Sequence, residues 1–365
     1  MTATEPAADV AVPVALAPPT DADFAAQWPY YDEQIGLGVE RFLSPPRDDC
    51  PWCRSKELKV RIRLPDQVQG KPGRFTLQEC RTCGHVFQNP RLSVEGLNFY
   101  YRDCYDGLGG ATAEAMFSWG AELYLARARM VTPFLTPRTW LDVGTGYGHF
   151  CQQARTVWPE AVFDGLDMSD GLDAGVARGW LDHAYKGMFP DLVAEVAGRY
   201  DVLSMSHYLE HTTDPRAELD AAARALAPGS YFLVEVPDPE CALGRILGRW
   251  WAPWGQPQHL HLIPLRNLMA ALIERGLTPV AVDRGAAHIP VELTYVVMAM
   301  LAAAGPNPQI PWLRHKPLVA RRYAAVWKRA SPLIAAAYKA DQRTSPWLRR
   351  PGWANSYRIL ARRDE

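Results

Sequence analysis

The sequence predicts an α/β fold, in which a mainly parallel, doubly wound sheet is preceded by a small cysteine-rich domain and interrupted near its end by helices. Three observations predict it. A short apolar strand at 140–143 runs into a glycine-rich turn and then into a helical pattern from Phe150 to Val157. A second strand follows and ends at Asp167, and strands then alternate with helices as far as Asp283. Two Cys-x-x-Cys pairs stand before all of these elements.

The glycine-rich turn at 144–148 reads Gly-Thr-Gly-Tyr-Gly. Glycine permits a positive φ and lets a ligand approach the backbone closely. Asp142 stands just before the turn, and a phosphate-binding turn would avoid this charge because a helix N-terminus attracts anions. A ligand with a cationic or amine group fits better. Asp167 lies about twenty residues further on, where the ribose-binding acid of doubly wound nucleotide folds is found.

These stretches resemble class I S-adenosylmethionine (SAM)-dependent methyltransferases. The loop 142–148 is similar to the family's cofactor loop, and 200–215, with Leu-Glu-His inside it, is similar to the fourth strand and its signature. The turn 227–229 and the strand 231–236 match the elements that follow, so the resemblance covers roughly 130–285. It implies a Rossmann-like seven-stranded sheet, SAM as the cofactor and an enzyme that transfers a methyl group. A dinucleotide-binding Rossmann domain is the alternative for the turn alone.

The resemblance also implies the cofactor contacts. Asp142 and Asp167 would bind SAM, and Met188 with Phe189 would give its adenine an apolar face after a short third strand near Ala184. An acid frequent in the family at this place is missing here, and Asp191 is the nearest. The complete set of expected cofactor residues is Asp142, Gly144, Thr145, Gly146, Tyr147, Asp167, Met168, Met188, Phe189 and Ser206.

Ionisable groups follow the fourth strand, at the edge where open α/β sheets bind ligands. His211 could be a general base, since an unperturbed imidazole has a pKa of about 6.5, and Glu210 could orient it. The pattern Tyr208-x-Glu210-His211 resembles zinc-containing sugar C-methyltransferases, whose Tyr, Glu and His form the reaction centre. The alternative is a structural role in which His211 caps the next helix. The candidate catalytic residues are His207, Tyr208, Glu210, His211, His259 and His261.

His259 and His261 lie after the fifth strand, where the family places its substrate lid. Residues two apart on an extended segment face the same side, so either could replace His211 as the base, or both could hold a metal. The tryptophans of 250–254 suggest stacking on a sugar ring or an aromatic acceptor, and core filling is the alternative.

The two Cys-x-x-Cys pairs, Cys50/Cys53 and Cys80/Cys83, are separated by 26 residues that include an alternating strand. This is zinc-ribbon spacing, with four thiolates around one ion. A closed four-Cys site has no open position for chemistry, so a structural metal is favoured over a recognition module. The run that follows resembles the N-terminal part of bacterial methyltransferases with a small zinc domain. In those a Tyr reaches the active site, and here Tyr100, Tyr101 or Tyr105 could do so.

The remaining segments complete the expected organisation. Residues 1–25 are expected to be a disordered tail, 26–110 the zinc-ribbon domain and linker, and 111–285 the SAM-binding domain, with one helix over 116–130 before its first strand. Residues 286–354 are expected to form a helical insertion, with helices over 293–303 and 318–339, and 355–365 the last strand of the sheet. The stretch 314–350 is rich in Lys and Arg with a single acid, Asp341, which is typical of peripheral membrane contact, of anionic-ligand binding or of a solvated lid.

Composition limits the functional classes. The formal net charge of −1 argues against nucleic-acid binding, and the paired cysteines argue for a reducing, cytoplasmic location. No apolar run is long enough to span a membrane. We expect methyl transfer to a hydroxyl or a keto-sugar carbon of a small-molecule or saccharide acceptor. The alternatives are an RNA methyltransferase that uses the ribbon for recognition and a non-catalytic SAM-binding scaffold.

Overall fold

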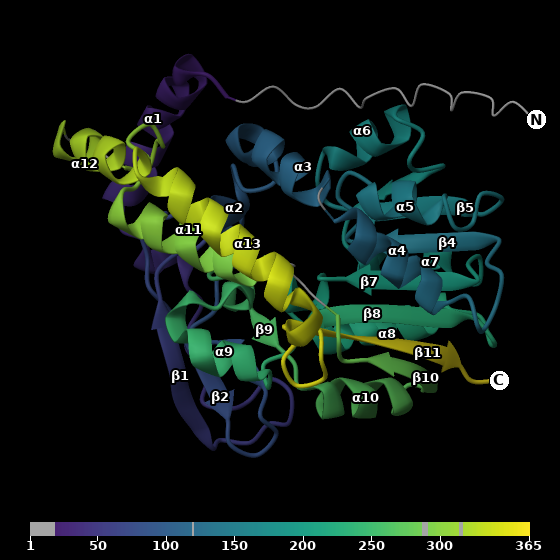
Figure 1. Cartoon of the computed structure of the whole chain (residues 1–365). Helices are drawn as coiled ribbons and strands as arrows, with labels where there is room; N and C mark the ends of the chain where they lie inside the picture. Colours follow the sequence, from purple (N-terminus) through teal and green to yellow (C-terminus); the bar gives the residue numbers. More distant parts are fainter. Residues whose placement is uncertain (1–18, 119, 287–290, 314–316) are drawn as a thin grey trace, which may run out of the picture.

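The computed structural model describes residues 19–118, 120–286, 291–313 and 317–365. Figure 1 shows the larger sheet on the right, and a second sheet with a layer of helices on the left. The larger sheet has seven strands in the order β10-β11-β8-β7-β4-β5-β6. Only β11 runs antiparallel to its neighbours, β8 and β10. The predicted fold class is therefore confirmed.

The strands of this sheet are β4 (Thr139–Val143), β5 (Val162–Asp167), β6 (Ala184–Lys186), β7 (Val202–Ser206), β8 (Tyr231–Pro237), β10 (Leu277–Asp283) and β11 (Ser356–Arg363). Helices cover both faces, which is why the central strands are apolar on both sides. On one face lie α4 (Ala121–Met130), α5 (His149–Ala154) and α6 (Gly171–Ala177). On the other lie α7 (Phe189–Val196), α8 (Pro215–Ala225) and α10 (Leu265–Ile273). Trp140 faces the first layer, whereas its neighbour Leu141 faces the second.

The smaller sheet has the order β1-β2-β3-β9. Its first three strands are β1 (Leu58–Leu64), β2 (Phe75–Cys80) and β3 (Val86–Gln88), and they belong to the cysteine-rich domain. The fourth, β9 (His261–Leu262), comes from the segment after β8 and pairs antiparallel with β3. The segment predicted as a substrate lid thus continues the sheet of the N-terminal domain. Sequence reasoning missed this link, because a two-residue strand leaves no periodicity.

Further helices come from the N-terminal part of the chain and from the segment before β9 (Figure 1). They are α1 (Asp21–Gly36), α2 (Val94–Tyr101), α3 (Gly110–Ser118) and α9 (Ala242–Leu247), with 3₁₀ turns at Glu40–Phe42, Gly107–Gly109, Gly248–Trp250 and Ala252–Trp254. A further 3₁₀ turn, Leu209–His211, follows β7 of the larger sheet. The helix expected over 116–130 is two helices, because Gly120 stands between α3 and α4 and favours no helix.

The predicted disordered tail, 1–25, is too long, because residues 21–25 are already helical. A capping box starts α1 at Asp21: Thr20 Oγ1 accepts from Asp23 N at 3.3 Å, and the Asp23 carboxylate accepts from Thr20 N at 2.8 Å. The rest of that prediction, 1–18, lies outside the described residues.

The insertion between β10 and β11 is helical, as expected. Its helices are α11 (Glu292–Ala304), α12 (Pro317–Trp327) and α13 (Ala330–Leu348), so the helix predicted over 318–339 is in fact two. Trp327 is the last residue of α12, and its Nε1 donates to Gly305 O at 2.8 Å. This hydrogen bond connects the end of α12 to the end of α11. Asp341 is buried and accepts from Leu293 N and Thr294 N at the start of α11. The single acid of this basic stretch is therefore the cap that joins α13 to α11.

Candidate active site

The glycine turn after β4 adopts the conformation that its sequence predicts. Gly144, Gly146 and Gly148 have φ angles of +78°, +55° and +83°. A Cβ on Gly144 would lie 2.6 Å from the Tyr208 ring, so this glycine lets the turn pack against the segment after β7. A Cβ on Gly146 would meet nothing within 4 Å. Only at Gly146 does the backbone thus face open space, as a backbone that receives a ligand must.

Two acids flank this turn on the same edge of the sheet. Asp167 accepts from Gly146 N at 2.9 Å and from Ser169 N at 2.8 Å, so its carboxylate is fixed before any ligand arrives. Asp142 is buried and accepts from Ser204 Oγ at 2.5 Å. Burial is the main cause that raises the pKa of Asp142 to about 6, and the nearby charge of Asp167 contributes to this value. The pair suits a ligand with a sugar hydroxyl group and an amine.

The expected adenine contacts divide between exposed and buried residues. Met168 and Met188 are 63% and 37% exposed and can cover an apolar ring. Phe189 is fully buried in the core under α7, so it cannot form the face that we expected of it. Thr145 and Tyr147 are buried in the turn, and Ser206 Oγ, at the end of β7, has no hydrogen-bond partner within the described parts of the chain.

The segment after β7 forms a compact ionisable cluster with two other parts of the chain. One donor atom from each of Glu210, His211 and His259 lies within 4.8 Å of the other two. The rings of His211 and His259 meet edge to face, with their centroids 4.6 Å apart. The Tyr101 hydroxyl is hydrogen-bonded to His211 Nδ1 at 2.7 Å. Of the three tyrosines considered, Tyr101 is the one that reaches His211.

Burial sets the protonation of the two histidines. Burial is the main cause that lowers the pKa of His211 to about 3, and repulsion from His259 contributes to this value. Burial also lowers the pKa of His259, against the opposing effect of the Glu210 charge. Both imidazoles are therefore neutral at neutral pH and carry a lone pair. His211 is a weaker base than its unperturbed pKa suggested.

His207 connects this cluster to the core. Its φ is +53°, and its ring nitrogens lie 3.1 Å from Glu210 Oε1 and 2.9 Å from Glu235 Oε1. Burial opposes the charged imidazolium, but these two hydrogen bonds outweigh it and raise the pKa of His207. Glu235 also accepts from Arg127 at 3.0 Å and from Arg358 at 2.6 Å. His207 therefore links the Glu210 carboxylate to the buried Glu235 and holds it in place.

Two other candidates face away from the cluster. The Tyr208 hydroxyl donates to Glu218 on α8 at 3.1 Å. His261 lies on β9, and its Nδ1 is 3.1 Å from Nε2 of His85 in the cysteine-rich domain. The alternative role of His211 as a helix cap is wrong, because Asp214 caps α8 by accepting from Arg216 N and Ala217 N.

Two of the three tryptophans expected to stack on an acceptor, Trp251 and Trp254, fill the core instead. Trp251 and Trp254 are buried and pack against β1–β3 and α9, with their ring centroids 4.9 Å apart. The bulk of two indoles between the small sheet and this segment explains their burial. Core filling, the alternative interpretation, is thus the one that the structure supports for both.

The four cysteines form one cluster, with all four Sγ atoms within 4.8 Å of one another. Cys50 Sγ and Cys83 Sγ are 3.7 Å apart, and Cys53 Sγ and Cys80 Sγ are 3.5 Å apart. A tetrahedron with Zn–S bonds of about 2.3 Å has edges of about 3.8 Å. The donor set and spacing therefore fit one zinc ion with no open coordination position.

Comparison with known proteins identifies the larger unit. Residues 119–282 match the family model described as a methyltransferase domain. This chain contains a methyltransferase domain. The match contains the glycine turn, both acids and the cluster after β7, so the predictions of the enzyme class and of SAM are confirmed at this level.

Individual relatives of this methyltransferase are distant. The ubiquinone biosynthesis O-methyltransferase of Bordetella avium is 27% identical over 177 residues, which cover 44% of this chain and 70% of that protein. An O-methyltransferase family protein from Burkholderia thailandensis is 17% identical, with a TM-score of 0.42 over 49% of this chain and 57% of that one. A SAM-dependent methyltransferase from Archaeoglobus fulgidus is 16% identical, with a TM-score of 0.42 over 66% of this chain and 94% of that one. Among the described helices, none has the length and apolar character needed to cross a membrane.

Proposed function

We propose that this methyltransferase moves a methyl group from SAM to a hydroxyl oxygen, or to a keto-sugar carbon, of a small-molecule or saccharide acceptor. One observation carries the proposal: Tyr101, Glu210, His211 and His259 converge beside the glycine turn, from three separate parts of the chain. A non-catalytic scaffold has no use for such a buried ionisable cluster, which is unfavourable to bury without a function. The Bordetella avium relative is named an O-methyltransferase, which agrees with an oxygen acceptor.

The residues supply alignment and a proton acceptor. SAM brings a sulfonium whose methyl group is already activated. The acceptor oxygen forms a bond to the methyl carbon as the C–S bond breaks, and the electron pair stays on sulfur, which leaves S-adenosylhomocysteine. The proton from the acceptor goes to an imidazole nitrogen of His211 or His259, and the buried Glu210 carboxylate stabilises the imidazolium. Alignment in a closed site supplies most of the rate.

The direct test is an acceptor screen with the purified full chain. Phenols, catechols, nucleotide-linked sugars and keto-sugars are incubated with SAM, and S-adenosylhomocysteine release is measured. We expect turnover with at least one small-molecule class and none with transfer RNA or ribosomal RNA. Tight SAM binding with no turnover on any class would favour the scaffold, and turnover on RNA alone would favour the RNA methyltransferase.

The pH dependence of SAM binding tests Asp142. Its pKa is raised to about 6 in the free protein, and only the ionised carboxylate attracts the SAM amine. Below pH 6 the ionised fraction falls, so the Kd for SAM should rise by up to about tenfold per pH unit. Calorimetry between pH 5 and pH 8 measures this. Asp142→Asn should bind weakly and with little pH dependence, and a variant that kept the wild-type slope would contradict the assignment.

We also propose that the four-cysteine cluster holds a structural zinc ion. Cys53 is the exposed member, so Cys53→Ser removes a ligand without disturbing the core. We expect this variant to lose one zinc per chain on dialysis against a chelator, and amide exchange in β1–β3 to accelerate. The matched control is Cys104→Ser, which lies outside the cluster and should retain the metal. Equal zinc retention in both variants would contradict the site.

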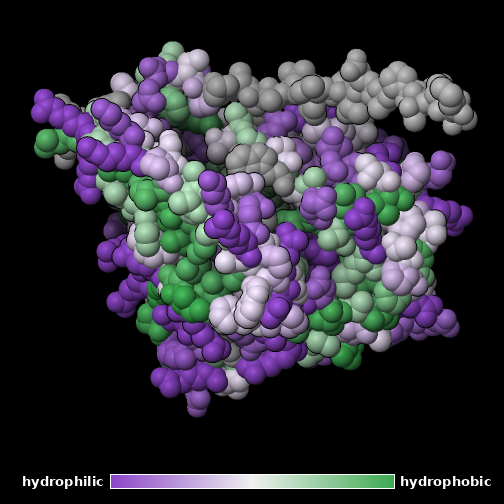
Figure 2. Space-filling model, viewed as in Figure 1, coloured by the Kyte–Doolittle hydropathy of each residue, from purple (hydrophilic) through white to green (hydrophobic). Residues whose placement is uncertain are grey.

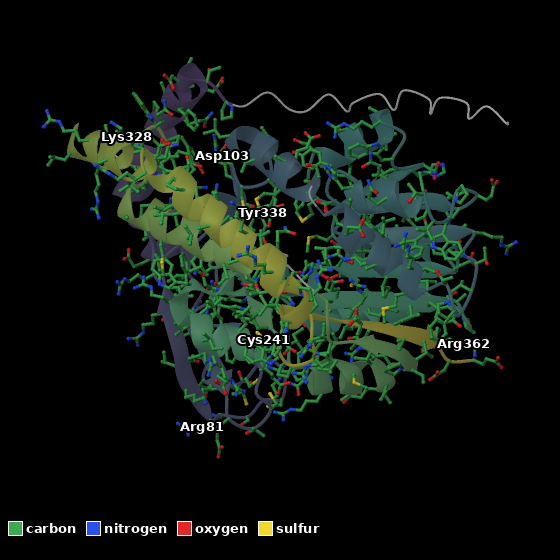
Figure 3. All side chains as sticks on the ribbon, viewed as in Figure 1. Arg81, Asp103, Cys241, Lys328, Tyr338 and Arg362 are labelled. Atoms are coloured by element: carbon green, nitrogen blue, oxygen red, sulfur yellow. The ribbon has the colours of Figure 1, made fainter. Side chains whose placement is uncertain are left out.

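The insertion is proposed to contact anionic lipid. Exposed apolar side chains, Leu318, Leu333, Tyr338 and Trp347, share α12 and α13 with exposed Arg and Lys residues. Figure 2 shows hydrophobic and hydrophilic surface side by side over these helices, and Figure 3 labels Tyr338 on α13 and Lys328 between α12 and α13. We expect salt-sensitive cosedimentation with phosphatidylglycerol vesicles, reduced by Arg321→Glu with Arg322→Glu. Equal binding to neutral vesicles would contradict an electrostatic contact.

A further inference from the structure

The cluster at Glu210, His211 and His259 has the composition of a metal site as well as that of a base. Two imidazoles and one carboxylate, each able to offer one donor atom, lie within 4.8 Å of one another. Two His and one Glu form the protein ligand set of several catalytic zinc sites, in which the remaining position holds water or substrate. The four-cysteine cluster is the other group of this kind within the described residues, and its ligands are all thiolates.

Each member of the cluster is held through the atom that a metal would not use. Glu210 Oε1 lies 3.1 Å from His207 Nδ1, whereas Glu210 Oε2 is buried and has no hydrogen-bond partner among the described residues. His259 donates from Nδ1 to Pro253 O at 2.8 Å, so its lone pair is on Nε2. His211 uses Nδ1 for the Tyr101 hydroxyl at 2.7 Å. Outer contacts of this kind orient the ligands of metal sites in proteins.

The buried oxygen is the observation that a base alone does not explain. A carboxylate oxygen without a hydrogen bond is unfavourable in a buried position, and Glu210 is 1% exposed. Orienting a histidine requires a hydrogen bond to that histidine, and the one described for Glu210 goes to His207, through the other oxygen. A cation at the centre of the cluster would satisfy Oε2.

We propose that Glu210, His211 and His259 bind a second divalent ion, of the zinc type, with positions left open for the acceptor oxygen. The binding of this ion does not depend on the proposed function, but its role in methyl transfer does. The ion would lower the pKa of a coordinated hydroxyl, so that the acceptor reacts as an alkoxide or enolate without a strong base. The proton lost from the acceptor passes to solvent or to a neighbouring imidazole that is not coordinated. Acceptors with two neighbouring oxygens, such as catechols and α-hydroxy ketones, would then be preferred.

The test measures metal content and does not depend on activity. Wild type, Glu210→Gln, His259→Gln and Cys53→Ser are loaded with Zn²⁺, desalted and analysed for metal per chain. We expect two ions in the wild type and one in each variant. His261→Gln is the matched control, because it removes a buried histidine of the same segment that lies against His85 instead, and it should keep two ions. Circular dichroism and SAM binding verify folding of every variant.

Cobalt substitution assigns the two ions to their sites. Co²⁺ bound by thiolates gives intense charge-transfer absorption, whereas Co²⁺ bound by nitrogen and oxygen gives only weak d–d bands. His259→Gln should lose the weak bands alone, and Cys53→Ser should lose the intense ones. Tyr101→Phe removes the hydroxyl that contacts His211 and should lower the affinity for the second ion by about 10–100-fold. One ion in the wild type, or two in Glu210→Gln, would overturn the site.

The activity assay separates this inference from the proposed function. Two ions with no methyl transfer to any acceptor would overturn the function and leave the site intact. Methyl transfer at an unchanged rate when the second ion is removed would overturn its role in the reaction.

Discussion

Replacing His211 by Ala is expected to lower the turnover number by about 10²–10⁴ at saturating SAM. The ring of His211 lies between Tyr101, His259 and Glu210, so its removal takes away a proton acceptor and empties the centre of the cluster. The Kd for SAM should change little, because both acids that would hold SAM lie at the glycine turn. Rates of S-adenosylhomocysteine formation, with calorimetry for SAM, measure the two effects separately.

Two tyrosine variants make this prediction sharper. Tyr101→Phe removes the hydroxyl that contacts His211 and should reduce turnover substantially. Tyr208→Phe removes a hydroxyl that contacts Glu218 instead, and should leave turnover within a few-fold of the wild type. The reverse order would mean that the Tyr-x-Glu-His pattern assigns the catalytic tyrosine correctly and that the contact of Tyr101 is incidental.

The sheet could be predicted from the sequence because each strand carries a local signal. The apolar run of β4, the acid that ends β5 and the alternating final segment each occur within a few residues, and all seven strands form near the expected positions. Helix breaks were harder to predict. Gly120 interrupts one expected helix through its low helix propensity, and Trp327 ends another where its ring reaches Gly305, 22 residues away in sequence.

The candidate site could be predicted only in part, because its contacts join distant segments. Glu210 and His211 are adjacent in sequence, and a search for ionisable residues after a strand finds them. Tyr101 and His259 join them across 110 and 48 residues, and nothing local distinguishes Tyr101 from Tyr100 or His259 from His261. The pairing of β9 with the small sheet distinguishes the two histidines, because it places His261 against His85 and leaves His259 in the cluster. Phe189 likewise looked available for adenine because a sequence pattern does not show which side of α7 faces the core.

Glu235→Ala is expected to destabilise the fold by about 3–5 kcal/mol, the typical effect of leaving buried charges without their partner. Glu235 is fully buried on β8 and accepts hydrogen bonds from Arg127 and Arg358, which are 5% and 2% exposed. It also accepts from His207, which fixes Glu210. Removing the carboxylate takes away the counter-charge that is hydrogen-bonded to both guanidinium groups, and Arg358 retains only the Asp283 carboxylate at 4.0 Å. Urea unfolding followed by tryptophan fluorescence measures the loss.

The pH dependence and a surface control make the Glu235 prediction specific. Burial opposes the ionised form of Glu235, but the charges of Arg127 and Arg358 outweigh it and hold the pKa well below its usual value. The stabilisation is therefore present above the unfolded-state pKa of about 4.3 and is lost as the pH falls toward the folded-state value. Glu235→Ala should lack this part of the acid sensitivity. Glu274→Ala removes the exposed partner of Arg216 and should shift the urea midpoint far less. Equal shifts in the two variants would mean that the buried network contributes no more to stability than a surface ion pair. The contact from Glu235 through His207 would then not be what holds Glu210 in position.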